Sequence, residues 1–159
     1  MNDKNYVNIL LQDLRKKKQV LDKIIQANGK QQYALEDPNL DPDDFDVIVE
    51  EKARLIQQLE QLDDGFTQIY ERVREPLQTQ KELYADEIKE MQQLIRQLTE
   101  KSADIEAQEK RNKALMTQKF ASVRKQVREV RASQKVVNQY YQNMMKSKFI
   151  NPQFLDNKK

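Results

Sequence analysis

The feature that most constrains this chain is a heptad pattern of apolar residues between Asp41 and Val73. Asp41 and Pro42 form a strong helix start, because the Asp carboxylate can cap free backbone amides and Pro suits the first helical position. Spacings that alternate between three and four place two apolar rows on one stripe of the helix. Such a stripe predicts a coiled coil or a helical bundle. The rows, the first of them interrupted by Lys52, are Phe45, Leu59, Phe66 and Val73, and Ile48, Leu55, Leu62 and Ile69.

The composition agrees with long helices in contact with solvent. Charged residues make up 34% of the chain and hydrophobic residues 38%, with only two Gly and four Pro. This balance is typical of helical rods, and the apolar positions are too periodic for a disordered chain. The sequence therefore predicts an all-α fold, an elongated antiparallel bundle or coiled coil of three or four long helices. We expect a single domain over residues 1–159, a length that suits one domain.

The first helix is expected over about residues 4–36. Asn28 and Gly29 lie inside it, and we expect the helix to continue through them although Gly weakens a helix interior. Lys17 and Lys18 fall near the seam, where two interpretations are open. In one, their stems cover apolar surface while the ammonium groups reach water. In the other, they pair with carboxylates of a neighbouring helix. The apolar stripe comprises Val7, Leu10, Leu11, Leu14, Leu21, Ile24, Ile25 and Leu35.

A break over residues 37–42 contains two prolines and three turn-forming Asx residues. A connection this short joins helices that run antiparallel. Residues that face each other across the two helices should then have numbers that add up to roughly 79. This register brings Lys17 and Lys18 close to Asp63 and Asp64.

The second helix is expected over about 42–75, because Pro76 should stop or kink it and the heptad phase changes there. A long helical region should follow over about 77–147, with a bend or a solvated stretch near 99–112 where apolar residues thin out. As one straight helix it would extend about 105 Å at 1.5 Å per residue, whereas each of the first two helices reaches only about 50 Å. The region should therefore either fold back near 99–112 or project beyond the bundle. Residues 148–159 are expected to form a tail.

The carboxyl-terminal part of the chain carries more apolar residues than one helical seam requires. Met and Tyr suit adaptable contact surfaces, since Met is flexible and Tyr combines a large ring with a polar end. We predict a surface that accepts an amphipathic partner helix. The alternative is that this segment packs back on its own bundle. The candidate partner-binding residues are Val130, Val137, Tyr140, Tyr141, Met144, Met145, Phe149, Phe154 and Leu155.

The sequence gives no indication that the protein is an enzyme. The chain has no His, no Cys and no glycine-rich phosphate loop, so we expect no catalytic residues and no cofactor. The acidic stretch 36–51 lacks the spacing of a calcium loop, and we expect no metal site. No apolar run is long enough to span a membrane and the start is not a signal peptide, so we expect a cytoplasmic protein without membrane insertion.

A basic face near the carboxyl end raises the alternative of nucleic-acid binding. No aromatic residue alternates with the basic ones as a stacking platform needs, so we expect no nucleic-acid partner. Binding that weakens steeply with salt would contradict this expectation. The face consists of Arg124, Arg128, Arg131 and Lys135.

Several stretches resemble the flagellar export chaperones of the FlgN family. The stripe over residues 6–25 is similar to the first helix of that family, and Tyr140-Tyr141 with the segment 151–156 is similar to the tails of clostridial members. The related FliT-type chaperones share this helical build and are the near alternative. The most similar run is Val49-Glu50-Glu51-Lys52-Ala53-Arg54-Leu55-Ile56-Gln57-Gln58-Leu59-Glu60-Gln61-Leu62-Asp63, against the family's EK-x-x-LI-x-x-L-x-x-L core.

The resemblance implies a chaperone of the flagellar type III export apparatus. Its partners would be the terminal helices of hook–filament junction proteins of the FlgK/FlgL type, kept unassembled and delivered to the export gate. It also implies that the candidate residues on the carboxyl-terminal helix bind this cargo. An alternative from another class is a structural or adaptor coiled coil that works by permanent oligomerisation, since the same heptads can form a homodimer.

Overall fold

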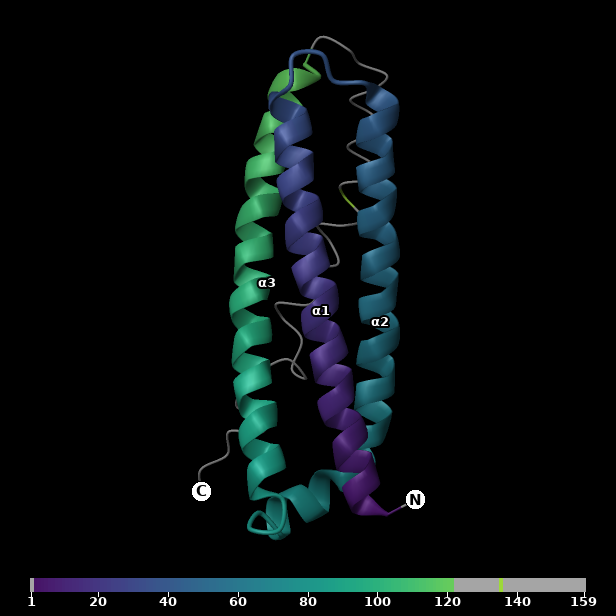
Figure 1. Ribbon diagram of the computed structural model, residues 1–159, viewed down its shortest axis with the longest axis vertical. Coiled ribbons are helices and arrows are strands. Elements are labelled where there is room, and N and C mark those ends of the chain that lie inside the picture. Colours follow the sequence, from purple (N-terminus) through teal and green to yellow (C-terminus); the bar gives the residue numbers. More distant parts are fainter. Residues whose placement is uncertain (1, 122–134, 136–159) are drawn as a thin grey trace.

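The computed structural model describes residues 2–121 and residue 135, and shows three long helices side by side (Figure 1). They are α1 (Asp3–Glu36), α2 (Pro42–Thr79) and α3 (Ala85–Lys119). The chain reverses between consecutive helices, so α1 and α3 run in one direction and α2 in the other. The predicted all-α helical bundle is confirmed.

The first helix, α1, lies between the other two. It packs closely against both α2 and α3 along its length, whereas the backbones of α2 and α3 make no comparable approach to each other (Figure 1). The hydrophobic stripe of α1 therefore has to serve two neighbours. This explains why its buried positions occupy a wider arc than a two-stranded seam would need.

Local signals account for the starts of α1 and α2. The Asn2 side chain accepts a hydrogen bond from the Asn5 backbone N–H at 3.0 Å. Asp41 Oδ1 accepts one from the Asp43 N–H at 2.9 Å, and Pro42 stands at the first helical position as the sequence predicts. Gly29 lies inside α1, which continues unbroken to Glu36.

The second helix ends later than the sequence indicates. α2 passes through Pro76 to Thr79, so the helix does not stop near residues 75–77. A kink was the other expectation, and the last turns of α2 run sideways toward the base of α3 (Figure 1). A proline removes one backbone donor but leaves its own carbonyl free, and the Gln80 N–H donates to the Pro76 carbonyl at 2.8 Å. Leu77 is buried in the core and holds this last turn against the bundle. A turn then leads into α3, which begins at Ala85 and not near 77.

The third helix is continuous over the stretch 99–112, so the expected bend or solvated segment there is also wrong. The polar residues of this stretch sit in core positions, and Ser102, Glu109 and Asn112 are all buried. The helix ends at Lys119, and Phe120 packs edge-on against Phe45 with ring centroids 5.8 Å apart. The helical region expected over about 77–147 therefore does not fold back near 99–112, and its first helix ends at Lys119.

The apolar core runs the length of the three helices in two clusters. The larger cluster contains most of the buried side chains of α1, the middle and end of α2, and the first two thirds of α3. A smaller cluster closes the end of the bundle where α1 passes into α2. Its buried members are Leu35, Phe45, Val49, Met116 and Phe120.

Candidate functional site

The predicted partner-binding residues all lie outside the described residues. This applies to Val130, Val137, Tyr140, Tyr141, Met144, Met145, Phe149, Phe154 and Leu155. The described helices form the scaffold to which that segment is joined. Three features of this scaffold bear on function: two buried ion pairs, a polar ladder between α1 and α3, and the apolar packing of α2 and α3 around α1.

The first ion pair joins α1 to α2. Lys17 Nζ lies 2.7 Å from Asp63 Oδ1, and Lys17 is only 3% exposed. Burial lowers the pKa of Lys17, and the neighbouring Asp63 carboxylate offsets part of this effect. The antiparallel register from the sequence places these two residues together, and the interpretation that the Lys17 ammonium reaches water is wrong. Lys18, the next residue, is partly exposed.

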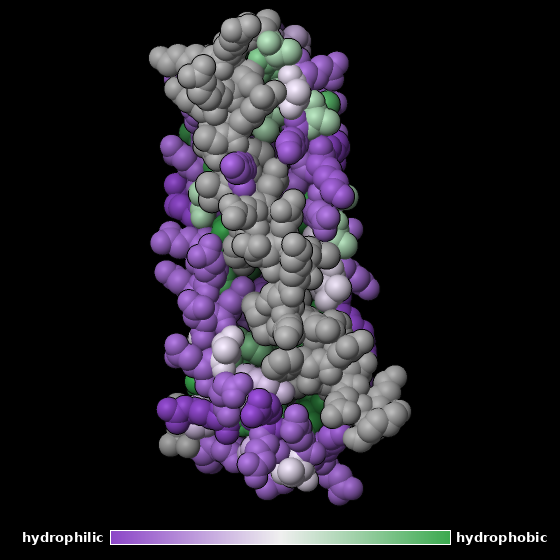
Figure 2. All heavy atoms as spheres, turned by 180° about the vertical axis from the view of Figure 1, so that it is seen from behind, coloured by the Kyte–Doolittle hydropathy of each residue, from purple (hydrophilic) through white to green (hydrophobic). Residues whose placement is uncertain are grey.

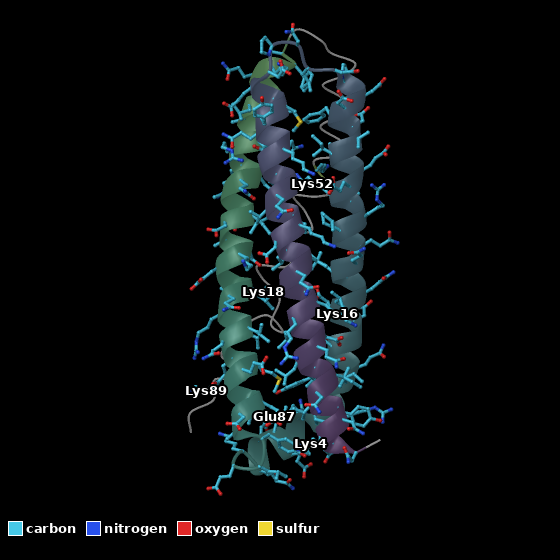
Figure 3. All side chains as sticks on the ribbon, in the orientation of Figure 1. Lys4, Lys16, Lys18, Lys52, Glu87 and Lys89 are labelled. Carbon is cyan, nitrogen blue, oxygen red and sulfur yellow. The ribbon has the colours of Figure 1, made fainter. Side chains whose placement is uncertain are left out.

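The second ion pair joins all three helices. Lys52 of α2 is fully buried, and its Nζ donates to Gln31 Oε1 of α1 at 3.0 Å and to Glu109 Oε1 of α3. Lys52 lies in the upper half of the bundle as drawn in Figure 3. Burial lowers the pKa of Lys52, and Glu109 opposes that shift. Because no solvent reaches its Nζ, Lys52 positions helices and has no access to a substrate.

A ladder of amides continues from this pair between α1 and α3. Asn112 Nδ2 donates to Gln31 Oε1 and to the Asn28 backbone carbonyl, both at 3.0 Å. Asn28 Nδ2 in turn donates to Gln108 Oε1 at 3.0 Å. A buried polar group is costly unless it is hydrogen-bonded, so these bonds favour one register of α3 on α1 over registers shifted by a heptad.

Sequence reasoning missed this network, although a signal for it was present. Lys52 interrupts an apolar row, and Ser102, Glu109 and Asn112 fall at heptad positions of α3 where apolar residues would be expected. Polar residues in a seam often fix register. The stretch 99–112 was interpreted instead as a bend or as solvated helix.

The third feature is the apolar packing of α2 and α3 around α1. On α3, Lys101 binds Asp22 and Asn28 donates to Gln108, so this side of the helix faces α1. The next residue after Gln108, Glu109, contacts Lys52 of α2. On α2, both Arg72 and Asp63 contact α1, through Tyr6 and Lys17. The buried side chains beside these contacts include Ile56, Tyr70 and Leu77 on α2, and Ile95, Ser102 and Met116 on α3.

The rest of the described surface is largely hydrophilic. Seen from behind, charged and polar side chains line both flanks of the molecule, and a few apolar side chains show between them (Figure 2). Among the described residues, the large hydrophobic side chains that are exposed are Tyr33, Val47 and Leu83.

The described part of the chain contains neither a group of side chains that could hold a metal ion nor a membrane-spanning helix. In residues 2–121 and 135, no group of three or more acidic side chains is placed to hold a metal ion. None of the described helices has a stretch long and apolar enough to cross a membrane.

Comparison with known protein families places most of the chain in one family. The family model described as FlgN protein matches residues 1–146. No curated protein and no solved structure matches the chain. The matched range covers all three helices and continues through most of the segment that holds the predicted partner-binding residues. The chain therefore belongs to the FlgN family, a family of flagellar export chaperones.

Proposed function

We propose that this protein binds the terminal helices of hook–filament junction proteins of the FlgK/FlgL type, keeps them from assembling early, and delivers them to the export gate in the cytoplasm. The observation that carries the proposal is the family match, which extends through residue 146. That range includes Val130, Val137, Tyr140, Tyr141, Met144 and Met145, apolar residues that lie outside the described part of the chain.

The distribution of apolar surface supports this location for the binding site. The three helices bury their apolar rows against one another, and their outer surface is charged. An amphipathic partner helix binds through anchors spaced three and four residues apart. Val137, Tyr140, Tyr141 and Met144 have that spacing. Phe149, Phe154 and Leu155 would extend the same surface or contact the gate.

This mode of binding needs no cofactor or nucleotide. Junction subunits assemble through amphipathic terminal helices, and a helix that covers their apolar stripe prevents assembly by occupying it. Release requires that the complex be of modest stability, and Met-rich contacts without a rigid core suit this requirement. A scaffold held in one register keeps the base of the binding segment fixed while the segment adapts to its cargo.

The direct test is calorimetric titration with a peptide from the carboxyl terminus of a junction protein. Tyr140→Ala combined with Met144→Ala should weaken binding by about tenfold or more, since a few apolar anchors carry most of the energy of such contacts. Helicity by circular dichroism should persist. A matched control is Tyr33→Ala combined with Leu83→Ala, which removes exposed apolar side chains of the scaffold and should leave affinity unchanged. Unchanged affinity in the first double variant would remove the proposed site.

Light scattering separates this function from that of a permanent coiled-coil oligomer. The chaperone should form a complex of defined stoichiometry when the peptide is added. A structural oligomer would keep the same mass with and without the peptide.

A further inference from the structure

The outer surface of the α1–α2 pair carries two patches of opposite charge, one after the other along the bundle. The first, which we call the lysine row, consists of Lys16, Lys23 and Lys30, all of them exposed on α1. These lysines recur every seven residues, so they form a straight row with about 10.5 Å between neighbours. Within the described residues none of the three forms a salt bridge. Lys16 lies on the α2 side of α1, whereas Lys18 lies on the α3 side (Figure 3).

The second patch, which we call the acidic patch, surrounds Val47 in the first turns of α2. Val47 is 58% exposed although it is apolar. Carboxylates stand three and four residues before it and after it, which places all of them around Val47 on the helix surface. In the described part of the chain these carboxylates have no basic partner either. They belong to Asp43, Asp44, Glu50 and Glu51.

The contacts between α1 and α2 place both patches on the same side of the helix pair. Asp13 Oδ2 lies 4.0 Å from the position that a Cβ of Gly65 would take, outside the buried ion pair of the two helices. Burial raises the pKa of Asp13 and the charge of Lys16 opposes this, so Lys16 stands beside this rim and, being exposed, on its outer side. On α2, Gly65 shares its heptad row with Asp44 and Glu51.

Most of the lysine row cannot neutralise the acidic patch within one chain. The antiparallel register places Asp44 opposite about residue 35 of α1. This is roughly 18 Å along the axis from Lys23, and still further from Lys16. Only Lys30 and Glu51 lie where the two patches adjoin.

A second copy of the chain, related by a two-fold axis perpendicular to the bundle, brings the opposite charges together. The rotation makes α2 of the second copy parallel to α1 of the first. Asp44 and Glu51 are seven residues apart, which is also the spacing of Lys16 and Lys23. Both ion pairs therefore form in the same register, and the symmetry repeats them on the other side of the axis.

We propose that this surface is an interface between two copies of the chain, in which the lysine row of each copy binds the acidic patch of the other. The interface goes beyond the proposed function and does not depend on it. A single exposed ion pair contributes little, but here the pairs act together and the partner copy also covers Val47. Because the attraction is between exposed charges, the dimer is reversible and weakens as salt screens it.

The mass of the full chain in solution tests the interface directly. Sedimentation equilibrium should show a dimer that forms with increasing protein concentration at about 50 mM salt and dissociates at about 500 mM salt. A monomer at all concentrations up to about 1 mM would overturn the proposal and leave the surface to another protein. A dimer that is insensitive to salt would overturn it as well.

Charge reversal identifies the surface that forms the dimer. Lys16→Glu with Lys23→Glu makes one variant, and Asp44→Lys with Glu51→Lys makes the other. Each alone should raise the dimer dissociation constant at least about tenfold, because the symmetry introduces every like-charge contact twice. An equal mixture of the two variants should associate about as tightly as the original protein, since every ion pair is then present again. A mixture that stays monomeric, or a variant that still dimerises alone, would overturn the interface.

The matched control separates this contact from the effect of net charge. Lys89→Glu with Lys113→Glu changes the net charge by the same amount as the first variant, at exposed positions of α3. It should leave the dimer dissociation constant unchanged, and equal weakening in this control would overturn the proposal. Circular dichroism should show the same helicity in all three variants. The measurements use no cargo peptide, so their outcome is independent of the proposed function.

Discussion

Two lysines occupy positions in the apolar seams of α1 and α2, and each binds a carboxylate of another helix. Lys17 contacts Asp63, and Lys52 contacts Glu109. Removing a charge from water is costly, and a buried pair compensates for this only when both partners are present. Such pairs therefore contribute more to the choice of register than to stability.

Replacing one partner of the Lys52 pair should be far more damaging than replacing both. We expect Lys52→Met to lower the free energy of unfolding by about 3–5 kcal/mol, because Glu109 is left as an unpaired buried charge. Lys52→Met with Glu109→Leu should bring stability back to within about 1 kcal/mol of the original, or above it. Urea unfolding followed by circular dichroism gives both values, with the exposed Lys113→Met as control. Equal losses in the single and double variants would contradict this account.

The lowered pKa of Lys17 and of Lys52 predicts how stability varies with pH. Between the lowered native pKa and the unfolded value near 10.5, the unfolded chain binds more protons than the native one. The contribution of these lysines to stability should therefore rise as pH increases through that window. Tyr70, whose pKa is raised by burial, contributes in the opposite sense only above pH 10. Urea unfolding from pH 7 to 9.5 should show a smaller rise in Lys52→Met with Glu109→Leu than in the original protein.

At the scale of the element, the length of each helix is determined by the packing of its apolar seam more than by single residues that disfavour helices. α1 passes through Gly29 and α2 through Pro76, although both residues disfavour helix interiors. Ala27 and Leu77, which lie close to these breakers, are buried against neighbouring helices. Tertiary packing supplies most of the stability of a helix in a protein, and here it outweighs the local preference.

Gly29 gives a simple test of that balance. A methyl group at this position would meet no atom within 4 Å, and the residue is exposed on α1. Gly29→Ala should therefore raise the free energy of unfolding by about 0.5–1 kcal/mol, the intrinsic difference in helix preference. Ala103→Gly on the exposed side of α3 should lower it by a similar amount. A loss of stability in Gly29→Ala would mean that α1 does not continue through this position in solution.

At the scale of the whole molecule, α1 is the common partner and the two ends differ. One end is closed by the cluster of Phe45 and Phe120 together with the Lys52 pair, and these contacts connect α2 to α3. Along most of their length, α2 and α3 each pack more closely against α1 than against each other. Local stability should therefore depend on separate contacts at different levels of the bundle.

Hydrogen exchange should reveal this division. Phe120→Ala removes one ring of the edge-on pair and should cost about 3 kcal/mol or more. The amides in the last turns of α3 and the first turns of α2 should lose protection, while those around Met91 and Leu98 keep theirs. Phe120→Leu, which retains apolar volume, should lose much less. Uniform loss of protection along all three helices would show that the bundle opens only as a unit.

The sequence by itself determined that this chain is helical, that its helices pack through heptad seams, and that the break after Glu36 makes α1 and α2 antiparallel, bringing Lys17 to Asp63. Heptad periodicity and helix capping depend on residues close together in the sequence, so they can be recognised without a structure. Only the tertiary structure decided that Lys52, Glu109 and Asn112 form one buried network, and that α2 continues past Pro76. A polar residue at a seam position is consistent with a solvated bend or with a buried partner, and only a third helix brought alongside selects between them. The heptad pattern after α3 predicts a surplus of apolar residues near the carboxyl end, but periodicity alone does not specify which surface those residues meet.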